Sequence, residues 1–281
     1  MEAVPGWKMP WLWASSAALG LRHRRLFDEV EAYVMFVGHP RSGHSLVGAL
    51  LGAHPDTVIA HELDALRFVR LGFRRDQLFE LLLARDAEFA RADQRTKSGY
   101  QYAVPGASQG TFRRLRVIGD KKGGGSTSRL GAEPGLLDRL RAVVRVPVRI
   151  VNVVRNPYDN ITTLSRRSGK ALDDAAASYF RRCETVERIK AEAGDDFAQV
   201  RFETFVDDPI TELLRLCGFL GIEGSDDFVS AAVSIVAPRP HRSRLEADWT
   251  PGLVDSVRRR MERFGFLDGY GYVEPAGEPS S

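Results

Sequence analysis

Residues 33–52 read YVMFVGHPRSGHSLVGALLG and predict a strand, a loop bounded by glycines and a helix. In this order, the loop amides and the positive end of the helix dipole converge on one point and bind a phosphate group. Gly38, Gly43 and Ser45 match the phosphate-loop pattern G-x-x-x-x-G-K-[ST]. His44 stands where that pattern has lysine. The stretch therefore predicts a phosphate site that lacks the ammonium group a kinase uses.

Strand patterns alternate with helical patterns along the rest of the chain. We expect strands near 34–37, 57–59, 117–118, 148–154 and 200–202, and loops at 95–110 and in the glycine tract 123–128. We expect helices at 46–52, 63–73, 76–91, 136–144, 158–168, 173–193, 210–220, 226–235 and 253–264. This alternation predicts an α/β fold with a central, mostly parallel sheet flanked by helices. Such sheets bind ligands at the carboxyl ends of their strands.

The chain is long enough for one large α/β domain or two small ones. We divide the 281 residues into an N-terminal segment (1–32), one domain (33–270) and a flexible tail (271–281). Lys and Arg number 40 against 37 Asp and Glu, so the net charge of +3 gives no reason to expect nucleic acid as a partner. Cys183 and Cys217 lack metal-ligand spacing. We expect them to be reduced thiols in a cytoplasmic protein.

The N-terminal segment is rich in tryptophan. An apolar run from Met9 to Leu21 contains Trp11 and Trp13 and precedes the basic cluster 22–25. The run is shorter than the roughly 20 residues that span a bilayer. It could form a helix at a membrane interface, or it could pack on the domain or line a substrate entrance. We favour packing on the domain over membrane contact.

A second phosphate site is predicted after the strand expected at 148–154. Arg155 stands at the end of this strand, and Pro157 suits the first position of the helix that follows. Asn156 is then the N-cap residue. Thr163 lies two turns into the helix, where its hydroxyl could face the same anion as Arg155.

The two motifs together resemble those of sulfotransferases that use 3′-phosphoadenosine 5′-phosphosulfate (PAPS). Residues 40–45 resemble the core P-[KR]-S-G-[TS]-[TS] of the 5′-phosphosulfate loop. The arginine form of this loop is similar to that of tyrosylprotein sulfotransferases and many bacterial relatives. Arg155 to Asp159 match the 3′-phosphate motif R-[ND]-P-x-D, and Thr163 takes its serine position. The resemblance implies a P-loop-containing sulfotransferase fold and sulfuryl transfer from PAPS, without a metal, to a hydroxyl or amine.

The resemblance also implies which residues hold the donor. Phe202, in a segment like R-[YF]-E-D-L, would approach the adenine. Arg242 lies seven residues before Trp249, as in the family's R-K-G-x-x-G-D-W clamp, but both glycines are missing, and Arg244 is a second candidate. The donor-binding residues are then Arg41, Ser42, Gly43, His44, Ser45, Arg155, Thr163, Phe202 and Arg242.

Sulfuryl transfer needs cations at the departing phosphate and a base for the acceptor proton. Arg41 is the first cation, and a G-D-K segment shared with bacterial relatives favours Lys121 over Lys122 as the second. Glu62 follows Arg41 by 21 positions, which is the spacing of the catalytic glutamate in tyrosylprotein sulfotransferases. Glu62 is therefore the predicted base, and the adjacent His61 is the alternative.

Two other function classes compete with this interpretation. In a phosphate-loop kinase that uses ATP, Asp120 would act as the acid at the end of a strand, but His44 replaces the essential lysine. A non-catalytic nucleotide-binding module would not need Glu62 and Lys121. The acceptor stays open between a small molecule, a carbohydrate or lipid hydroxyl, and a peptide tyrosine. The oligomeric state also stays open.

Overall fold

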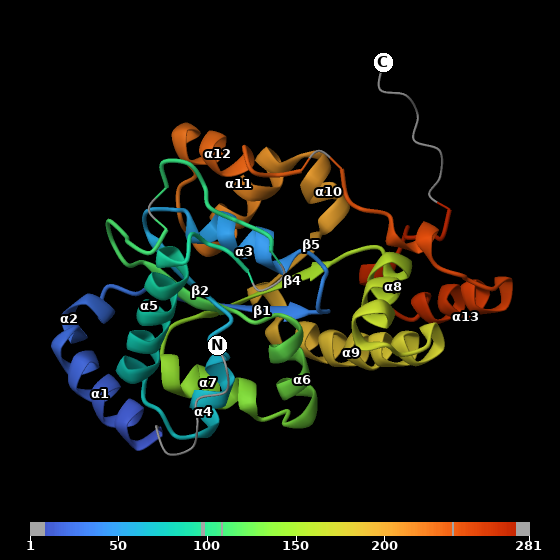
Figure 1. Ribbon diagram of the computed structural model, residues 1–281. Coiled ribbons are helices and arrows are strands. Elements are labelled where there is room, and N and C mark those ends of the chain that lie inside the picture. The colour runs from blue at the N-terminus through green and yellow to red at the C-terminus, as the bar shows by residue number, and fades with distance from the viewer. Residues whose placement is uncertain (1–8, 97–98, 108, 238, 274–281) are drawn as a thin grey trace.

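A parallel sheet forms the centre of the computed structural model, which describes residues 9–96, 99–107, 109–237 and 239–273 (Figure 1). In this part of the chain the strands are β1 (Ala32–Gly38), β2 (Thr57–His61), β3 (Val117–Lys121), β4 (Val148–Val154) and β5 (Phe197–Arg201). Their order across the sheet is β2-β3-β1-β4-β5, and every neighbouring pair is parallel. The predicted α/β fold with a parallel sheet is therefore confirmed.

Helices connect and cover the strands. They are α1 (Met9–Arg22), α2 (Arg24–Phe27), α3 (His44–Gly52), α4 (Ala65–Arg70), α5 (Arg75–Arg91), α6 (Gly124–Ala132), α7 (Leu136–Val144), α8 (Pro157–Ser168), α9 (Leu172–Ala193), α10 (Phe202–Asp207), α11 (Pro209–Leu220), α12 (Asp226–Val233) and α13 (Pro251–Met261). Each helix expected from the sequence is present, with shifted ends in most cases. The helix expected at 63–73 is shorter because Asp64 adopts a left-handed backbone conformation and α4 begins after it.

The glycine tract 123–128 was expected to be a loop, and this prediction is wrong. Residues 124–128 form the first turns of α6, and Gly123 is its N-cap residue. A Cβ at Gly123 would lie 2.8 Å from the His44 ring, and one at Gly124 would meet the Pro40 ring. The glycines therefore allow α6 to approach the loop after β1. The strand expected at 200–202 also ends earlier, because Phe202 begins α10.

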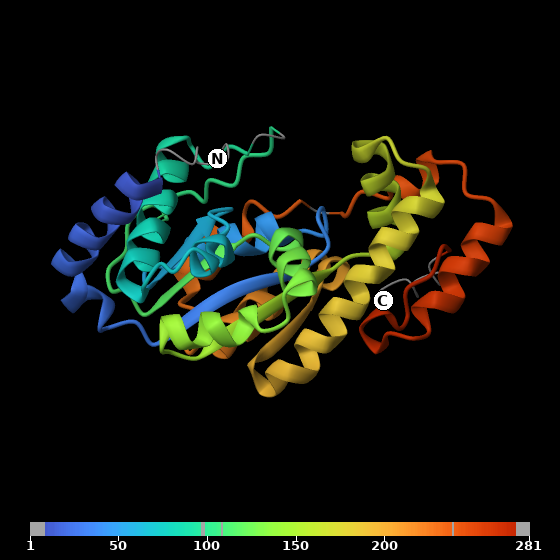
Figure 2. The ribbon, with the colours of Figure 1, turned by 90° about the horizontal axis from the view of Figure 1, so that it is seen from below.

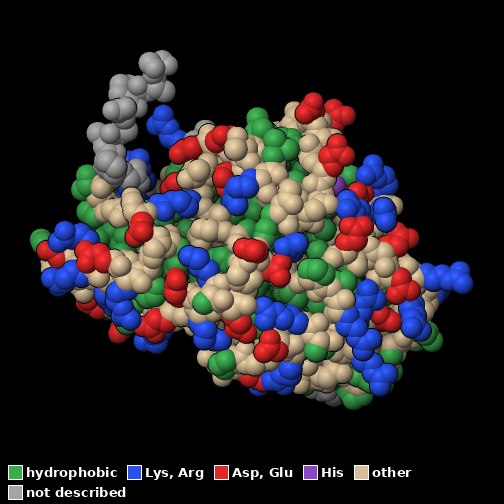
Figure 3. All heavy atoms as spheres, turned by 180° about the vertical axis from the view of Figure 1, so that it is seen from behind, with side chains coloured by type: hydrophobic (Ala, Val, Ile, Leu, Met, Phe, Trp, Pro, Cys, Tyr) green, Lys and Arg blue, Asp and Glu red, His purple; other side chains and the backbone are tan. Residues whose placement is uncertain are grey.

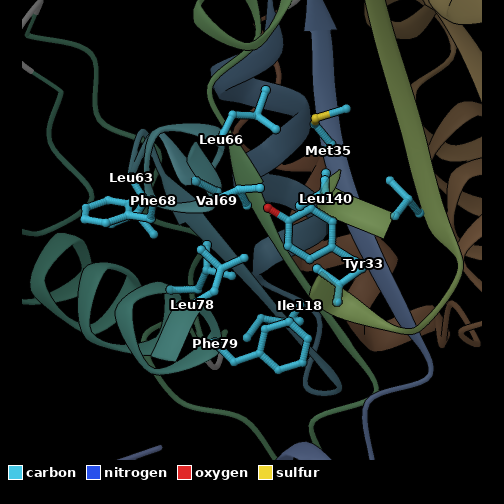
Figure 4. Packing of buried hydrophobic residues seen from close by; sticks show 14 of the residues in the cluster. Tyr33, Met35, Leu63, Leu66, Phe68, Val69, Leu78, Phe79, Ile118 and Leu140 are labelled. Atoms are coloured by element: carbon cyan, nitrogen blue, oxygen red, sulfur yellow. The ribbon is translucent and has the colours of Figure 1, made fainter. Parts of the chain in front are cut away.

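The strand β1 is buried along its whole length and divides the core into two layers. Tyr33 and Met35 point to the face covered by α4, α5, α6 and α7, where they join Leu66, Val69 and Leu140 (Figure 4). Val34 and Phe36 point to the opposite face, which α3, α11 and α12 cover. Burial on both faces explains the uninterrupted apolar run at the start of the quoted sequence.

The ends of the molecule are helical. Figure 2 shows α1 and α2 (dark blue) at one end and α13 (red) at the other. A further cluster joins α8, α9 and α13 through residues such as Tyr158 and Phe180. Cys183 and Cys217 are buried free thiols. Trp7 and the tail from residue 274 lie outside the described residues.

The surface carries charges of both signs. Figure 3 shows acidic and basic side chains interspersed over the face seen from behind. Neither sign of charge dominates this face, so it gives no indication of a polyanionic partner.

Within the described residues, none of the helices combines the length and the apolar character needed to cross a membrane.

We predict that Gly119→Ala destabilises the fold, because its Cβ would overlap the Val34 carbonyl of the neighbouring strand. Overpacking of this kind costs about 1–3 kcal/mol. The control is Gly218→Ala in α11, where no atom lies within 4 Å of the new Cβ. Alanine in a helix should leave stability unchanged or raise it by up to about 1 kcal/mol. Urea denaturation measures both free energies of unfolding. Equal stability of Gly119→Ala and the parent chain would contradict the β1–β3 register.

Candidate active site

A cavity of about 710 Å³ lies at the carboxyl ends of the strands. Its lining includes a residue from the end of each strand or from the segment after it: Glu62 (β2), Lys121 (β3), Arg41 (β1), Arg155 (β4) and Phe202 (β5). Parallel strands bring these segments to one edge of the sheet. The strand order therefore sets the order of the residues, from Glu62 at one side to Phe202 at the other.

The loop after β1 has the backbone geometry of an anion cradle. Gly38, Arg41 and Gly43 all have positive φ, at 117°, 70° and 106°. Gly43 is the N-cap residue of α3 and has no side chain that could cap the helix. The first amides of this helix therefore remain available to a ligand. The backbone N–H of Gly38 donates to Thr127 Oγ1 at 2.7 Å, which fastens the start of the loop to α6.

The ring of His44 is a structural group. Its Nε2 lies 2.6 Å from the carbonyl oxygen of Val37, and its Nδ1 lies 3.1 Å from Ser42 Oγ. Burial lowers the pKa of His44 to about 4, so the ring is neutral. The ring fastens the loop to the end of β1, and only the backbone N–H of His44 is placed to meet an anion.

Lys121 brings an ammonium group to the loop from the neighbouring strand. Its Nζ donates to Ser45 Oγ at 3.0 Å and to Glu62 Oε1 at 3.2 Å. The side chain passes α3 at Gly48, where a Cβ would lie 2.6 Å from the Lys121 stem. Lys121 therefore supplies from β3 the positive charge that position 44 lacks.

Glu62 lies on the cavity between two lysines. Its Oε2 is 3.7 Å from Lys122 Nζ, and its Oε1 accepts the hydrogen bond from Lys121. Burial acts to raise the pKa of Glu62, but Lys121 and Lys122 hold it at about 2. Burial lowers the pKa of Lys121, and the Glu62 carboxylate opposes this. Glu62 is therefore ionised near neutral pH and able to accept a proton.

His61 lies away from this cavity. Its ring stacks on Phe89 with 4.0 Å between the ring centroids. It lines a small hollow with Phe89 and Asp86, and Lys121 lines both this hollow and the main cavity. Burial, followed by the charge of Lys121, lowers the pKa of His61 well below its usual range. Of the two candidate bases, the geometry brings Glu62 to the loop after β1.

Arg155 and Thr163 lie together on the cavity. Arg155 donates through Nη2 to the carbonyl oxygen of His241, and its buried Nε has no hydrogen-bond partner among the described residues. Thr163 Oγ1 lies 3.1 Å from Ser243 Oγ. Ser243 also lines the cavity, and the sequence did not single it out. The same is true of Arg166 and Arg167, which lie one turn beyond Thr163 in α8. Helical spacing from Thr163 was the signal that could have found these arginines.

Ser42 and Arg242 lie away from the cavity. Ser42 is fully buried, and its hydroxyl donates to the His39 carbonyl at 2.9 Å. Arg242 is exposed and does not line the cavity, whereas its neighbours Arg239 and His241 do. The pattern that suggested Arg242 lacks its glycines, and here the chain forms a 3₁₀ turn over Ser243–Glu246.

Arg244, the second candidate for the clamp, is a structural residue. It is buried and pairs with Asp159. Its Nε also donates to the carbonyl oxygen of Tyr272 at 2.8 Å. The guanidinium group is therefore committed to α8 and the C-terminal segment.

Aromatic rings flank the loop after β1. The Phe202 ring lies so close to Gly43 that a Cβ there would overlap it. Tyr100 and Tyr102, which the sequence did not single out, also line the cavity. The Arg41 guanidinium lies 5.8 Å from the centroid of the Tyr100 ring. Among the described residues, no group of acidic, histidine or cysteine side chains is arranged to hold a metal ion.

Asp120 holds the segment that carries Glu62. Its buried carboxylate accepts hydrogen bonds from the backbone N–H groups of Leu63 at 3.0 Å and Ala65 at 2.8 Å. Glu62 and Asp64 both have positive φ, at 58° and 69°, which is rare for residues with a side chain. The two hydrogen bonds stabilise this strained turn and therefore position Glu62.

Comparison with known proteins agrees with these features. A sequence model of the sulfotransferase family matches residues 34–227. The structure is similar to the sulfotransferase domain from the curacin biosynthetic pathway, with a TM-score of 0.51 and 14% identity over 83% of this chain and 96% of that chain. It is also similar to sulfotransferase STF9 from Mycobacterium avium, with a TM-score of 0.51 and 12% identity over 92% and 82%. No match was found among curated protein sequences.

We predict that Asp120→Asn lowers kcat at least tenfold and leaves the affinity for adenosine 3′,5′-bisphosphate (PAP) within twofold. The amide retains one acceptor oxygen for two backbone donors, so the turn at Glu62 loosens. Burial raises the pKa of Asp120 to about 6, so turnover of the parent enzyme should fall as this carboxyl becomes protonated below pH 6. This fall should be absent in Asp120→Asn.

The matched control is Asp86→Asn on α5, another buried aspartate that accepts one backbone hydrogen bond, from Gly110 at 3.2 Å. It lies outside the main cavity and should keep its kcat. Equal losses of kcat in both variants would show a general effect on stability and would contradict the positioning role of Asp120.

Proposed function

The chain belongs to the sulfotransferase family, whose enzymes take their sulfuryl group from PAPS, and we propose that its cavity binds PAPS along the strand ends and transfers the group to a hydroxyl or amine next to Glu62. One observation carries this proposal. The cavity lining brings together cations from the carboxyl ends of three strands, Arg41 after β1, Lys121 at the end of β3 and Arg155 after β4. PAPS carries phosphate groups at two positions, and we assign Arg41 and Lys121 to the first and Arg155 to the second.

The 5′-phosphosulfate lies in the loop after β1 in this proposal. The amides of Gly43 to Ser45 and the guanidinium group of Arg41 would bind its oxygens. The 3′-phosphate would take Arg155 and the hydroxyl of Thr163. The buried Nε of Arg155, which lacks a partner among the described residues, supports a ligand at this point.

The adenine would lie at the β5 side of the cavity. Phe202, Val206 and Ala237 give this side an apolar lining. The Phe202 ring is half-buried against the loop after β1, so it presents a fixed surface to a base. Aromatic and aliphatic walls with few polar groups are typical of nucleotide-base sites.

In the transfer step, the acceptor oxygen forms a bond to sulfur while the bond from sulfur to the 5′-phosphate oxygen breaks. The products are PAP and a sulfate ester. Negative charge grows on the departing phosphate, and Arg41 and Lys121 are fixed cations that stabilise it. Glu62 takes the acceptor proton. Its carboxylate accepts a hydrogen bond from Lys121 Nζ at 3.2 Å, so base and cation lie side by side at the transferring group.

The low pKa of Glu62 suits a loose transition state. In such a state the acceptor has formed little bond to sulfur, so its proton is still held firmly. The proton becomes strongly acidic only when the new bond is nearly complete. The Glu62 carboxylate can accept a hydrogen bond from the acceptor hydroxyl in the transition state, orient its oxygen toward sulfur, and take the proton as the new bond is completed. The pairing with Lys121 and Lys122 does not prevent this.

The acceptor would approach from the β2 side. A second hollow, lined by Asp64, Arg129 and Ser128, shares Lys122 and Gly125 with the main cavity. It offers room for a small molecule with polar groups beside Glu62.

A kinase function has little support in the geometry. Asp120, the candidate acid of that alternative, is committed to the amides of Leu63 and Ala65 and does not line the main cavity. His44 offers no ammonium group to a γ-phosphate. A kinase also has no simple use for a cationic site at Arg155.

We predict that PAP raises the melting temperature without Mg²⁺ and does so more than AMP, which lacks the 3′-phosphate. Arg155→Ala should lower PAP affinity about 10- to 100-fold, as expected for a charged hydrogen bond worth ~1.5–3 kcal/mol, and should abolish the preference over AMP. Arg242→Ala, outside the cavity lining, is the matched control and should keep it. Stabilisation by ATP–Mg²⁺ with none by PAP would favour the kinase instead.

We also predict that Glu62→Gln lowers kcat roughly 100-fold or more, the usual contribution of a general base, with PAP affinity unchanged. His61→Gln, at the adjacent position, should retain most of its turnover. Mass spectrometry of an acceptor library incubated with PAPS measures the gain of one SO₃. Full turnover by Glu62→Gln together with loss in His61→Gln would make His61 the base.

A further inference from the structure

Helix α1 is apolar on both of its faces. Its inner face packs against α5, where a Cβ at Gly20 would lie 2.8 Å from the Asp76 backbone. Gln77 Nε2 also donates to the carbonyl oxygen of Trp13 at 2.9 Å. This contact confirms the expectation that the N-terminal segment packs on the domain. It accounts for the apolar residues on the inner face of the helix and leaves those on the outer face without a role.

The outer face exposes large apolar side chains. Trp11 is 71% exposed, Leu21 is 69% exposed and Leu19 is 43% exposed. No charged residue occurs from Met9 to Leu21. Trp11 and Leu21 lie about 80° apart around the helix axis at about 100° per residue, and both are on its exposed side. Soluble proteins rarely leave such a stripe uncovered unless it meets a partner.

Arginines follow this stripe immediately. Arg22, Arg24 and Arg25 are exposed at its C-terminal end. Arg24 also lines a hollow of about 670 Å³ with the exposed Arg74 and Arg145. The other charged residues of this hollow are Arg75, Asp28 and Asp76. Arg75 lies 3.7 Å from Asp28 and 3.5 Å from Asp76. Four arginines thus face two aspartates, and the hollow keeps a net charge of +2.

We propose that the outer face of α1 lies on the surface of a membrane that contains anionic lipids. Trp11 and Leu21 would enter the interface between headgroups and acyl chains, where tryptophan is favoured. Arg22, Arg24 and Arg25 would lie at the level of the lipid phosphates. The apolar side chains of α1 thus match the apolar part of the membrane interface, and the arginines that follow them match the layer of lipid phosphates.

This docking surface is connected to the acceptor side of the cavity. Helix α5 carries α1 on one side and packs on β2 on the other. Arg85 of α5 donates through Nε to the carbonyl oxygen of His61 at 2.7 Å, next to Glu62. Membrane contact through α1 would therefore hold the β2 end of the enzyme near the bilayer. The inference rests on α1 and its surroundings and holds whichever acceptor the enzyme uses.

The test is co-sedimentation of the full chain with vesicles of phosphatidylcholine alone or with one quarter phosphatidylglycerol. We expect at least tenfold more bound protein with the anionic vesicles and a loss of binding at high salt. Trp11→Ser/Leu21→Ser should abolish binding. Its matched control is Ile210→Ser/Leu214→Ser on α11, where the side chains are 49% and 43% exposed, and this variant should bind as the parent does.

Arg22→Gln/Arg24→Gln/Arg25→Gln should also lose binding, and this variant keeps the test informative if the Trp11/Leu21 double variant does not fold. All variants should keep the thermal shift with PAP, which separates this test from that of the proposed function. Absence of binding to anionic vesicles would overturn the proposal. A dimer in solution that Trp11→Ser/Leu21→Ser converts to a monomer, without vesicle binding, would also overturn it and would assign the face to a second copy.

Discussion

The hydrogen bonds of Lys121 Nζ to Ser45 Oγ and Glu62 Oε1 hold the candidate site together. They join β3 to the loop after β1 and to the segment after β2. A buried ammonium is tolerated only when it is paired and hydrogen-bonded, so these contacts depend on each other. The ion pair also couples Glu62 and Lys121, because each favours the charged form of the other. Removal of either partner would leave a buried or half-buried charge uncompensated, which is more costly than the loss of one contact.

The same arrangement explains why His44 can replace the lysine of a phosphate loop. Because the ammonium group comes from β3, position 44 does not need a lysine. The His44 ring instead fastens the loop: its Nε2 lies 2.6 Å from the carbonyl oxygen of Val37, and the ring packs against Gly123, the residue before α6. A neutral ring in this place stabilises the loop without adding charge. The loop after β1 therefore lacks its own lysine, and Lys121 of β3 brings the ammonium group to it.

Much of the fold and part of the site could be predicted from the sequence. The β1 loop and the turn at Arg155 are local motifs, so Arg41 and Arg155 could be predicted from short patterns. Glu62 was predicted from its spacing of 21 positions after Arg41 in the family resemblance, and parallel topology brings all three segments to one edge of the sheet. Tyr100 and Ser243 could not be found in this way, because they reach the cavity through long connections whose course depends on tertiary packing. The error at the glycine tract has a different cause. Glycine occurs in flexible loops and also where two backbones approach closely, and the sequence alone does not distinguish these uses.

The segment Gly119-Asp120-Lys121 shows how three residues of one strand can build a site. Side chains of a strand alternate between the two faces of the sheet. Gly119 allows β1 to approach, because any side chain there would overlap the Val34 carbonyl. Asp120 then holds the amides of Leu63 and Ala65, and Lys121, on the opposite face, holds the carboxylate of Glu62. Glu62 is thus held by a negative charge on the backbone of the segment that follows it and by a positive charge on its side chain. Because both groups come from adjacent residues, a shift of β3 by one position would exchange them and release Glu62 from both sides.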